Sequence, residues 1–345
     1  MKTRRDFLKL AGLSTASGLA GCAADSSSGS WSSQDQDYLK TAIVRNGTLG
    51  WAAWQEGRMV VSSNPNTRGT AYSITKSLAA LAATKAADDG WLSPSELVAD
   101  TISEWRGDSG KGKITVLMLL QQVSGLDAGG TALYSNHPRD KGKAAVSLSC
   151  VNTPGTVFRY GPGHWEALAE LMRRKLVARN DTLQGFMTKS VMSPLRLNTG
   201  NWRSDKQDIP YFSTGTELSS SEFGRLGELI SDLLSGKNSN GFTAEKFERM
   251  TRTSSVNPMF GGGLWRNINA SKANAMEIDV EDHLNRPLPS SFWARACLSR
   301  KQPSDFNALI GSSGRRIYIW PSGGKMIARL GPSHSWSDTR FLSGL

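Results

Sequence analysis

Short apolar runs predict β-strands near both ends of this chain. Residues 41–63, which read TAIVRNGTLGWAAWQEGRMVVSS, predict two or three short strands, with Asn46-Gly47 as a strong turn signal. Residues 315–331, RRIYIWPSGGKMIARLG, form the clearest hairpin pattern, because two strand-like runs flank a turn of proline, serine and glycine. Residues 337–345 predict a short helix that closes the chain. We therefore expect strands from distant parts of the sequence to form one sheet.

Helical periodicity dominates the region between these strands. One helix is predicted over about residues 73–87, where the sequence Asp-Asp-Gly then ends it. Another is predicted over about residues 163–178, with its large apolar side chains on one face. A further helix begins at a capping box formed by Ser219 and Glu222.

These elements predict an α/β fold of the α+β type, with an antiparallel sheet flanked by helices. The sheet would come from the N- and C-terminal segments, and a mainly helical lobe at about residues 95–240 would be inserted between them. A chain of 345 residues is long enough to bury a core in one large domain or in two intertwined lobes. A cleft between two such lobes is a common place for a functional site.

The N-terminus carries a pattern typical of export and lipid attachment. Arg4-Arg5 precede a short, weakly apolar stretch that ends in Leu19-Ala20-Gly21-Cys22. This resembles a twin-arginine signal joined to a lipoprotein signal-peptidase site, and an ordinary secretory signal with a basic leader is the simpler alternative. We expect residues 1–21 to be a signal peptide, Cys22 to be lipidated, and residues 22–36 to form a flexible tether to a folded domain at 37–345.

An exported lipoprotein would lie in the cell envelope, with the lipid on Cys22 in the membrane. Ala23-Ala24 follow without an acidic residue, which in a Gram-negative cell favours the periplasmic face of the outer membrane. Twin-arginine export usually carries folded proteins, so folding in a reducing cytoplasm favours free thiols at Cys150 and Cys297. The formal net charge of +11 comes without interleaved basic and aromatic residues, so no nucleic-acid partner is expected. The sequence does not indicate an oligomeric state.

Ser73 and Lys76 form the candidate catalytic pair. On a helix, the Ser-x-x-Lys spacing places the hydroxyl and the amine on one face, one turn apart. A serine hydroxyl needs a base within hydrogen-bond reach, and a desolvated lysine with a lowered pKa can be that base. Taken alone, the spacing favours a simpler interpretation, in which Ser73 caps the helix and Lys76 is solvated. The same spacing recurs at Ser322 and Lys325, in the predicted hairpin turn.

The residues around this pair resemble the β-lactamase-related serine hydrolases, which include class C β-lactamases, DD-peptidases, esterases and amide hydrolases. The matching segments come in the order typical of that family: Ile114-Thr115-Val116, Leu119-Leu120, Ser124-Gly125-Leu126, PGTVFRYGPGHWEALAELMRRKL at 154–176, SPLRLNTGNW at 193–202 and FGGGLWRN at 260–267. The likeness covers most of the chain from about residue 40. This ordered combination favours the catalytic interpretation of Ser73 and Lys76 over the helix cap.

The resemblance implies a β-lactamase/transpeptidase-like fold and a role for each residue of the site. Ser73 would be the acylated nucleophile and Lys76 its base, and Tyr160 would move a proton between the nucleophile and the leaving group. Pro162 stands where the family's Tyr-x-Asn motif has asparagine, as in esterase-like and 6-aminohexanoate-dimer-hydrolase-like members. The amide that orients a substrate amide in many members is therefore absent from this position.

The third family motif, Lys-Thr-Gly or His-x-Gly on an edge strand, is best matched by Leu309-Ile310-Gly311, followed by Ser312. No cation occupies its first position, which argues against a β-lactamase or DD-carboxypeptidase that recognises a substrate carboxylate. The turn after Gly311 could bring the backbone N–H of Ser312 beside that of Ser73 and complete an oxyanion hole. A plain glycine-rich turn is an equal alternative.

We therefore expect a serine hydrolase that forms an acyl-enzyme with a small, neutral ester or amide in the cell envelope. The alternative is a non-catalytic binding or scaffolding protein of the envelope that keeps the fold, since the second and third motifs are altered. No metal and no organic cofactor are expected, because His137, His164, His283 and His334 show no metal-ligand spacing. His164 follows Tyr160 closely and could line the cleft.

Overall fold

The computed structural model describes residues 30–44, 47–198, 200, 202–332 and 335–345. The α-helices are α1 (Ser33–Val44), α2 (Thr75–Asp88), α3 (Val116–Leu120), α4 (Lys141–Val146), α5 (Gly163–Val177), α6 (Leu183–Met187), α7 (Ser220–Leu234), α8 (Ala244–Thr251), α9 (Ser290–Trp293) and α10 (Asp338–Leu342). The strands are β1 (Gly50–Gln55), β2 (Arg58–Ser63), β3 (Arg68–Thr70), β4 (Glu217–Ser219), β5 (Phe260–Gly261), β6 (Leu264–Arg266), β7 (Met276–Glu277), β8 (Ala296–Cys297), β9 (Asn307–Gly311), β10 (Arg315–Trp320) and β11 (Lys325–Leu330).

Shorter helical turns connect these elements. They are η1 (Tyr72–Ile74), η2 (Val98–Asp100), η3 (Ser103–Trp105), η4 (Lys111–Lys113), η5 (Gly130–Ser135), η6 (Thr188–Met192) and η7 (Val280–His283). Some predictions concern residues outside this description, namely the signal peptide, Cys22, Asn46 of the predicted turn and His334.

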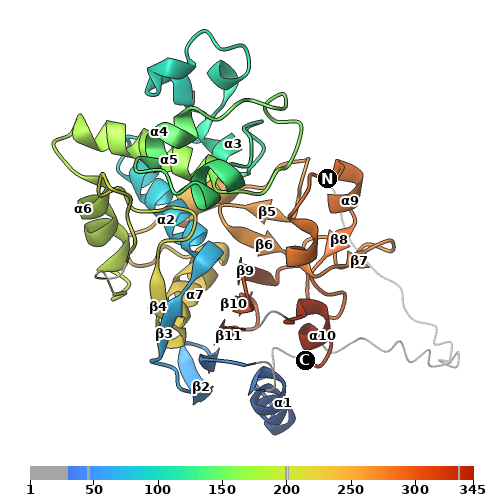
Figure 1. Cartoon of the computed structure of the whole chain (residues 1–345). Coiled ribbons are helices and arrows are strands. Elements are labelled where there is room, and N and C mark those ends of the chain that lie inside the picture. Colours follow the sequence, from blue (N-terminus) through green and yellow to red (C-terminus); the bar gives the residue numbers. More distant parts are fainter. Residues whose placement is uncertain (1–29, 45–46, 199, 201, 333–334) are drawn as a thin grey trace, which may run out of the picture.

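One antiparallel sheet joins the two ends of the chain. Its strand order is β2-β1-β11-β10-β9-β6-β5, with helices on its faces (Figure 1). Strand β1 pairs with β11 so that Gly50 lies opposite Leu330 and Gln55 opposite Lys325. The predicted hairpin is formed by β10 and β11. The predicted fold class is therefore confirmed, because the sheet combines N- and C-terminal strands and helices α2 to α9 lie between them in sequence.

The start of the folded domain differs from the sequence prediction. Residues 33–44 form helix α1, so the tether expected through residue 36 ends earlier and a strand from residue 41 is wrong. Leu39 and Ile43, four residues apart, are fully buried, as one face of a helix requires. Trp31 is also buried, and its indole donates to the backbone carbonyl of Trp54 at 2.8 Å. The folded domain therefore includes residues that the sequence analysis assigned to the tether.

The helices between β3 and β5 belong to two groups. Helices α3 to α6 lie together beside the end of the sheet (Figure 1). Helix α7, which the sequence assigned to the inserted lobe, instead packs against β1, β10 and β11. Its predicted capping box is present, since Ser219 Oγ accepts from Glu222 N at 3.2 Å and Glu222 Oε2 accepts from Ser219 N at 2.9 Å. Its apolar face covers the sheet, so the lobe is smaller than predicted.

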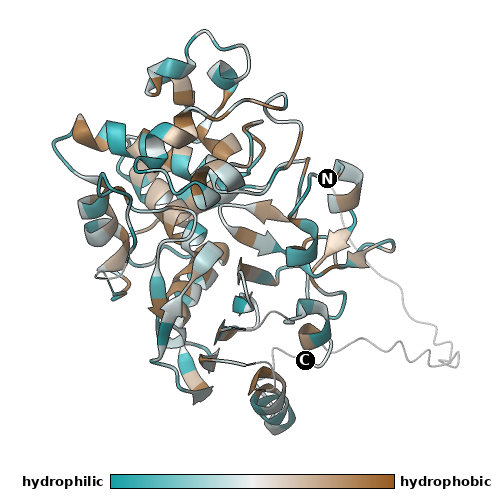
Figure 2. Cartoon of the chain, viewed as in Figure 1, coloured by the Kyte–Doolittle hydropathy of each residue, from teal (hydrophilic) through white to brown (hydrophobic). Residues whose placement is uncertain are grey.

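Helix α2 lies between the sheet and the helical lobe. Its residues Thr75–Thr84 are all buried, and many of them are alanines that allow close packing on every side. The helices of the lobe differ, because hydrophobic and hydrophilic residues lie side by side along them (Figure 2). A helix enclosed on all sides holds its side chains rigidly, which makes α2 a suitable support for a catalytic residue.

Candidate active site

Ser73 and Lys76 lie together at the start of α2. Ser73 belongs to the turn η1, which continues directly into the helix, and Lys76 follows one turn later. Ser73 caps neither element, because the cap positions are Ala71 and Ile74 and neither makes a side-chain cap bond. Instead, Lys76 Nζ donates to Ser73 Oγ at 2.8 Å. The interpretation of Ser73 as a helix cap with a solvated lysine is therefore wrong.

The amine of Lys76 is enclosed by protein. The residue is 1% exposed, and its Nζ also donates to the backbone carbonyl of Ser213 at 2.9 Å. Burial lowers the pKa of Lys76 to about 7, although the negative charge of Glu166 raises it in part. Near neutral pH a large fraction of the side chain is therefore the free amine. That form can accept a proton from Ser73.

Tyr160 lies on the loop before α5, beside the same serine. It lines the same cavity as Ser73, and Lys76 Nζ lies 5.0 Å from the centroid of its ring. The ring packs against Phe260 and Trp265. Burial raises the pKa of Tyr160 above its ordinary value. Near neutral pH the tyrosine thus keeps its proton while the lysine can lose one, which makes Lys76 the stronger candidate base.

The segment that contains the Ser-Gly-Leu motif holds Tyr160 in place. Gln122 Oε1 accepts from the backbone N–H of Gly161 at 2.7 Å, and the carbonyl of Gln122 accepts from Arg159 N at 3.0 Å. These two hydrogen bonds hold the backbone on both sides of Tyr160. Gln122, two residues before the motif, thus positions Tyr160.

His164 completes this support from within the fold. It is fully buried, with Nδ1 2.8 Å from Ser124 Oγ and Nε2 2.8 Å from the carbonyl of Arg159. Burial lowers its pKa to about 4, so the ring is neutral near pH 7. His164 does not line the cavity beside Ser73, contrary to the possibility raised by its place in the sequence.

A buried carboxylate lies behind Lys76, and no motif indicated it. Glu166 on α5 is 1% exposed and accepts from Ser213 Oγ at 2.5 Å and Ser213 N at 3.1 Å. The carbonyl of Ser213 in turn accepts from Lys76. Glu166 therefore fixes the loop that orients the lysine. An acidic residue in the first turn of a helix is ordinary, so no pattern in the sequence distinguishes Glu166.

The third motif meets the nucleophile turn as the end of strand β9. A Cβ on Gly311 would lie 2.5 Å from the carbonyl oxygen of Ala71, so only glycine allows β9 to come this close. Ser312 follows Gly311 and lines the same cavity as Ser73. The glycine-rich sequence is therefore more than a plain turn, because it places a backbone segment against the catalytic pair.

A buried arginine on the neighbouring strand helps to hold the end of β9. Arg316 on β10 is 1% exposed and donates to the carbonyl of Gly311 at 2.8 Å. It also forms ion pairs with Asp338 of α10 at 2.7 Å and with Glu281 of η7 at 2.6 Å. This cation lies behind the motif, so it does not replace the missing lysine or histidine at the first motif position.

A cavity of about 710 Å³ opens beside Ser73. Four predicted residues line it, namely Ser73, Lys76, Tyr160 and Ser312, and Gly311 lies directly behind it. The polar residues that the structure adds, and that the sequence did not indicate, include Tyr134, Arg203, Glu281 and Asn285. Each comes from a segment without a catalytic motif, so only the tertiary structure brings them to the site. Their side chains add a phenol, a cation, a carboxylate and an amide.

Comparison with known proteins agrees with this geometry. Residues 37–269 match the Beta-lactamase family. The chain belongs to the beta-lactamase family. Members of this family are serine hydrolases, a class that fits a serine hydrogen-bonded to a buried lysine. The comparison with curated proteins gives no match.

Solved structures with the same fold cover most of this chain. A penicillin-binding protein homologue from Caulobacter crescentus has 16% identity and a TM-score of 0.61 over 92% of this chain and 99% of its own. A beta-lactamase/D-alanine carboxypeptidase from Pseudomonas syringae has 16% identity and a TM-score of 0.58 over 89% and 95%. EstCE1, a hydrolase with promiscuous acyltransferase activity, has 13% identity and a TM-score of 0.61 over 90% and 96%. The TM-scores show a common fold, and at identities this low the likeness shows the fold alone.

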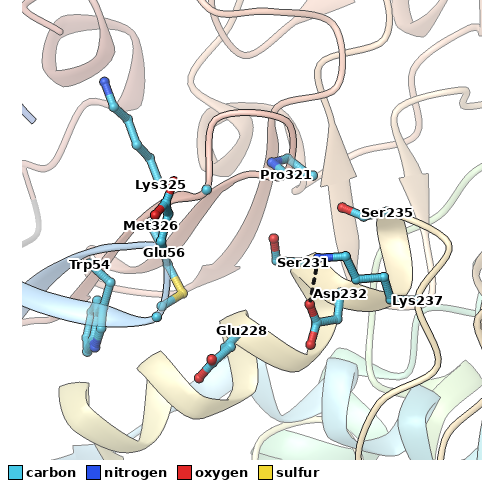
Figure 3. Close-up of a pocket in the computed structure, with 12 residues that line it drawn as sticks. Trp54, Glu56, Glu228, Ser231, Asp232, Ser235, Lys237, Pro321, Lys325 and Met326 are labelled. Atoms are coloured by element: carbon cyan, nitrogen blue, oxygen red, sulfur yellow. Dashed lines mark ion pairs between the residues drawn. The ribbon is translucent and has the colours of Figure 1, made fainter. Parts of the chain in front are cut away.

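A second cavity, of about 430 Å³, lies away from the catalytic pair (Figure 3). It is bordered by α7, by the β1–β2 hairpin and by the turn between β10 and β11. Lys237 and Asp232 at its edge form an ion pair of 3.8 Å. It shares no lining residue with the cavity beside Ser73, so the two are separate features of the family fold.

Three further features concern the thiols, possible metal sites and helix lengths of the described ranges. Cys150 and Cys297 are free thiols there, as predicted. No group of three or more histidine, cysteine, aspartate or glutamate residues in these ranges is arranged to hold a metal ion. None of the described helices is both long and apolar enough to span a membrane.

Proposed function

We propose that this protein is a hydrolase of the esterase or amidase type that forms an acyl-enzyme on Ser73. The observation that carries the proposal is the 2.8 Å hydrogen bond between Lys76 Nζ and Ser73 Oγ. The lysine is buried and its pKa lies near neutrality, as a general base for serine requires. A purely structural role would not require an amine to be enclosed at such a cost in desolvation.

Acylation would begin with proton transfer from Ser73 Oγ to Lys76 Nζ while Oγ bonds to the substrate carbonyl carbon. The carbonyl π electrons move to oxygen and form a tetrahedral oxyanion. The backbone N–H groups of Ser73 and Ser312 would donate to this oxyanion. Two observations support that pair, because both residues line the same cavity and Gly311 brings strand β9 against the nucleophile turn.

Release of the leaving group needs a proton donor. Tyr160 keeps its proton because burial raises its pKa, and it lies beside Ser73. As the bond to the leaving oxygen or nitrogen breaks, that atom would take the tyrosine proton, and the Lys76 ammonium would restore it. Water would then attack the acyl carbon by the reverse route, with Lys76 accepting its proton. The products are a carboxylic acid and free Ser73.

The esterase or amidase type is favoured over β-lactam or D-alanyl peptide hydrolysis. Leu309 stands where related enzymes have a cation on the edge strand, and Pro162 stands where many have asparagine. The solved relatives include EstCE1, described as a hydrolase with promiscuous acyltransferase activity, and a beta-lactamase/D-alanine carboxypeptidase. The altered motifs support the first kind of chemistry for this chain.

We also propose that the enzyme is exported by the twin-arginine route and anchored in the envelope by a lipid on Cys22. The sequence pattern before Cys22 supports this location. Replacing Cys22 by serine should move the protein from the membrane fraction to the soluble fraction. Unchanged membrane association of Cys22→Ser would contradict the lipid anchor without affecting the assignment of the active site.

A fluorophosphonate probe tests the nucleophile directly, because it labels activated serines. The wild type should be labelled and should hydrolyse 4-nitrophenyl esters, whereas Ser73→Ala should do neither. Ser322→Ala is the matched control, since Ser322 has the same Ser-x-x-Lys spacing on the hairpin turn. A folded wild type that is neither labelled nor active would support the alternative, a binding or scaffolding protein with this fold.

A further inference from the structure

The cavity beside Ser73 contains a cation that acyl transfer does not use. Arg203 lines this cavity and its side chain is exposed. Its backbone is held firmly, because Arg203 N donates to the carbonyl of Gly215 at 2.9 Å and its own carbonyl accepts from Tyr211 N at 3.0 Å. The loop between Tyr211 and Gly215 also contains Ser213, which binds Lys76. The backbone of Arg203 is therefore held against the loop that binds the catalytic lysine.

Carboxylates near Arg203 are bound to other groups. Asp205 accepts three backbone N–H bonds, with Oδ2 2.9 Å from Lys141 N and Oδ1 2.8 Å from Gln207 N and 3.1 Å from Ile209 N. Glu166 is occupied by the loop that holds Lys76. Within the described part of the chain, the guanidinium of Arg203 forms no ion pair and no hydrogen bond. Its charge is therefore available to a ligand.

The carboxylate that lines the cavity does not neutralise this charge. It belongs to Glu281, whose Oε2 is paired with the buried Arg316 at 2.6 Å. Arg315 lies beside it, donating to the carbonyl of Ser312 at 3.2 Å and stacking on the ring of Tyr72 at 4.5 Å. Arg316 thus balances the carboxylate of Glu281, whereas Arg203 has no such partner among the described residues. A cavity with this charge pattern attracts anions.

We propose that Arg203 binds a carboxylate or a similar anionic group of the substrate, so that the enzyme prefers esters or amides that carry a negative charge away from the scissile bond. This inference rests on the proposed function. A guanidinium suits the role because its planar N–H groups bind a carboxylate in a bidentate manner. The sequence favoured neutral substrates because strand β9 lacks a cation, but the loop that contains Arg203 supplies one.

Two pairs of esters test this preference on both sides of the scissile bond. The pair 3-(butanoyloxy)benzoate and 3-(butanoyloxy)benzamide differs only in the charge of the leaving group. The 4-nitrophenyl esters of 5-carboxypentanoic and 5-carbamoylpentanoic acid differ only in the charge of the acyl group. Measurements of kcat/KM should show that wild type prefers the anionic member of at least one pair. High salt should reduce that preference.

Substitution of Arg203 should remove the preference without harming catalysis. Arg203→Gln should lower kcat/KM for the preferred anionic ester by about five- to twentyfold and change its neutral partner by less than about twofold. Arg203→Lys should keep part of the preference, because it retains the charge but not the planar fork. Arg58→Gln is the matched control, since Arg58 is an exposed arginine on β2 that does not line this cavity.

The outcomes separate this inference from the proposed function. If the wild type is labelled at Ser73 and hydrolyses both members of each pair equally, or if Arg203→Gln lowers both equally, the anion site is wrong and the hydrolase assignment stands. If a folded wild type hydrolyses no ester and takes no fluorophosphonate label, the hydrolase assignment is wrong, and the anion site is wrong with it. Thermal unfolding of Arg203→Gln should match wild type, because its exposed side chain has no described partner.

Discussion

The two walls of the catalytic cavity are built in different ways. The nucleophile wall, residues 72–76, places Ser73 and Lys76 within one turn at the start of a helix that is buried on every side. The recognition wall consists of Arg203, Glu281 and Ser312, which come from three segments far apart in the sequence. The first wall is a local structure held by the core, whereas the second exists only because loops and strand ends meet.

This difference separates bond chemistry from substrate selection. A hydroxyl and a buried amine 2.8 Å apart need a rigid frame, and α2 provides it. Loops on a rigid scaffold tolerate change, so they are suited to determine which substrate enters. We therefore expect substitutions on the nucleophile wall to abolish reaction with every substrate. Substitutions on the recognition wall should change the rate by smaller factors that depend on the substrate.

The largest effect is expected from Ser73→Ala. Removing the nucleophile should lower ester hydrolysis by at least about 10³-fold, with little change in thermal stability, since Ser73 is only half-buried and caps no helix. Ser312→Ala is the comparison on the other wall, because only its backbone N–H is expected to act, and it should stay within about threefold of wild type. A loss in Ser312→Ala as large as in Ser73→Ala would contradict the division between the walls.

Lys76→Met should lower the rate by about 10³-fold and yet stabilise the fold. The pKa of Lys76 falls from 10.5 in the unfolded chain to about 7 in the folded protein, so the unfolded chain binds more protons between these pH values. Wild-type stability should therefore rise with pH across this window, because near pH 7 burial of the lysine costs on the order of 4 kcal/mol.

Urea unfolding at pH 7 and pH 9 measures this trade between activity and stability. Lys76→Met should be more stable than wild type at pH 7, and the difference should shrink at pH 9, where less energy is needed to keep the wild-type lysine neutral. Equal stability of the two proteins at both pH values would show that burial of Lys76 does not destabilise the fold. The lysine would then be an ordinary residue of the core.

Gly311→Ala tests how closely the recognition wall must approach the nucleophile wall. The new Cβ would lie 2.5 Å from the carbonyl oxygen of Ala71, so the end of β9 must move away. We expect a loss of about 1–3 kcal/mol in unfolding free energy. We also expect a fall of about 10- to 100-fold in kcat for the folded protein, because the N–H of Ser312 is displaced from the oxyanion.

Gly112→Ala is the control for this substitution. Its Cβ would meet only the carbonyl oxygen of Trp105, at 3.4 Å, and Gly112 lies outside the cavity. Both kcat and stability of this variant should stay close to wild type. If Gly311→Ala loses stability but keeps the wild-type kcat, Gly311 packs the fold and Ser312 does not contribute to the oxyanion hole.

The smallest effect on rate is expected from Glu166→Gln, which changes the support of Lys76 from behind. In wild type, kcat/KM should rise with pH up to about 7, because Lys76 must lose its proton to act as base. The negative charge of Glu166 raises the pKa of Lys76, so removing it should move this acid limb to lower pH. The maximal rate should fall only about fivefold, since glutamine keeps an acceptor for Ser213.

Glu170→Gln is the matched control, because Glu170 is a buried carboxylate one turn further along α5 that pairs with Arg173 and Arg174 instead. It should leave the acid limb in place. If the acid limb of the pH profile also stays in place in Glu166→Gln, then Glu166 holds the loop but does not set the charge state of Lys76.

The catalytic pair could be predicted because its geometry is local. The spacing of Ser73 and Lys76 fixes them on one helix face, and the ordered family segments raised that spacing above chance. Tyr160 was found in the same way, although its place beside Ser73 depends on Gln122 and the loop around it. Helix α1 was missed because its polar residues resemble a linker, and only burial of Leu39 against the rest of the fold makes it a helix.

Other residues gave no local signal. Glu166 is an ordinary acid in the first turn of a helix, and it matters only because the loop at Ser213 folds over it. Arg203 is one exposed arginine among many. Its proposed role follows from its place in the cavity wall, where no described carboxylate neutralises its charge. Helix α7 shows that even a correctly predicted element can be assigned to the wrong lobe. The apolar face of a helix predicts burial, but it does not identify the element that packs against it.

The sequence by itself determined the helix with Ser73 and Lys76, the hairpin of β10 and β11, and membership of a fold in which both ends of the chain share one sheet. These features depend on contacts between residues close in sequence or on patterns with a fixed period. The tertiary structure alone decided that Lys76 is buried and near neutral, that Gly311 touches the nucleophile turn, and that Arg203 and Glu281 face the same cavity. Desolvation and charge balance depend on every segment that surrounds a group, and no short stretch of sequence contains that information.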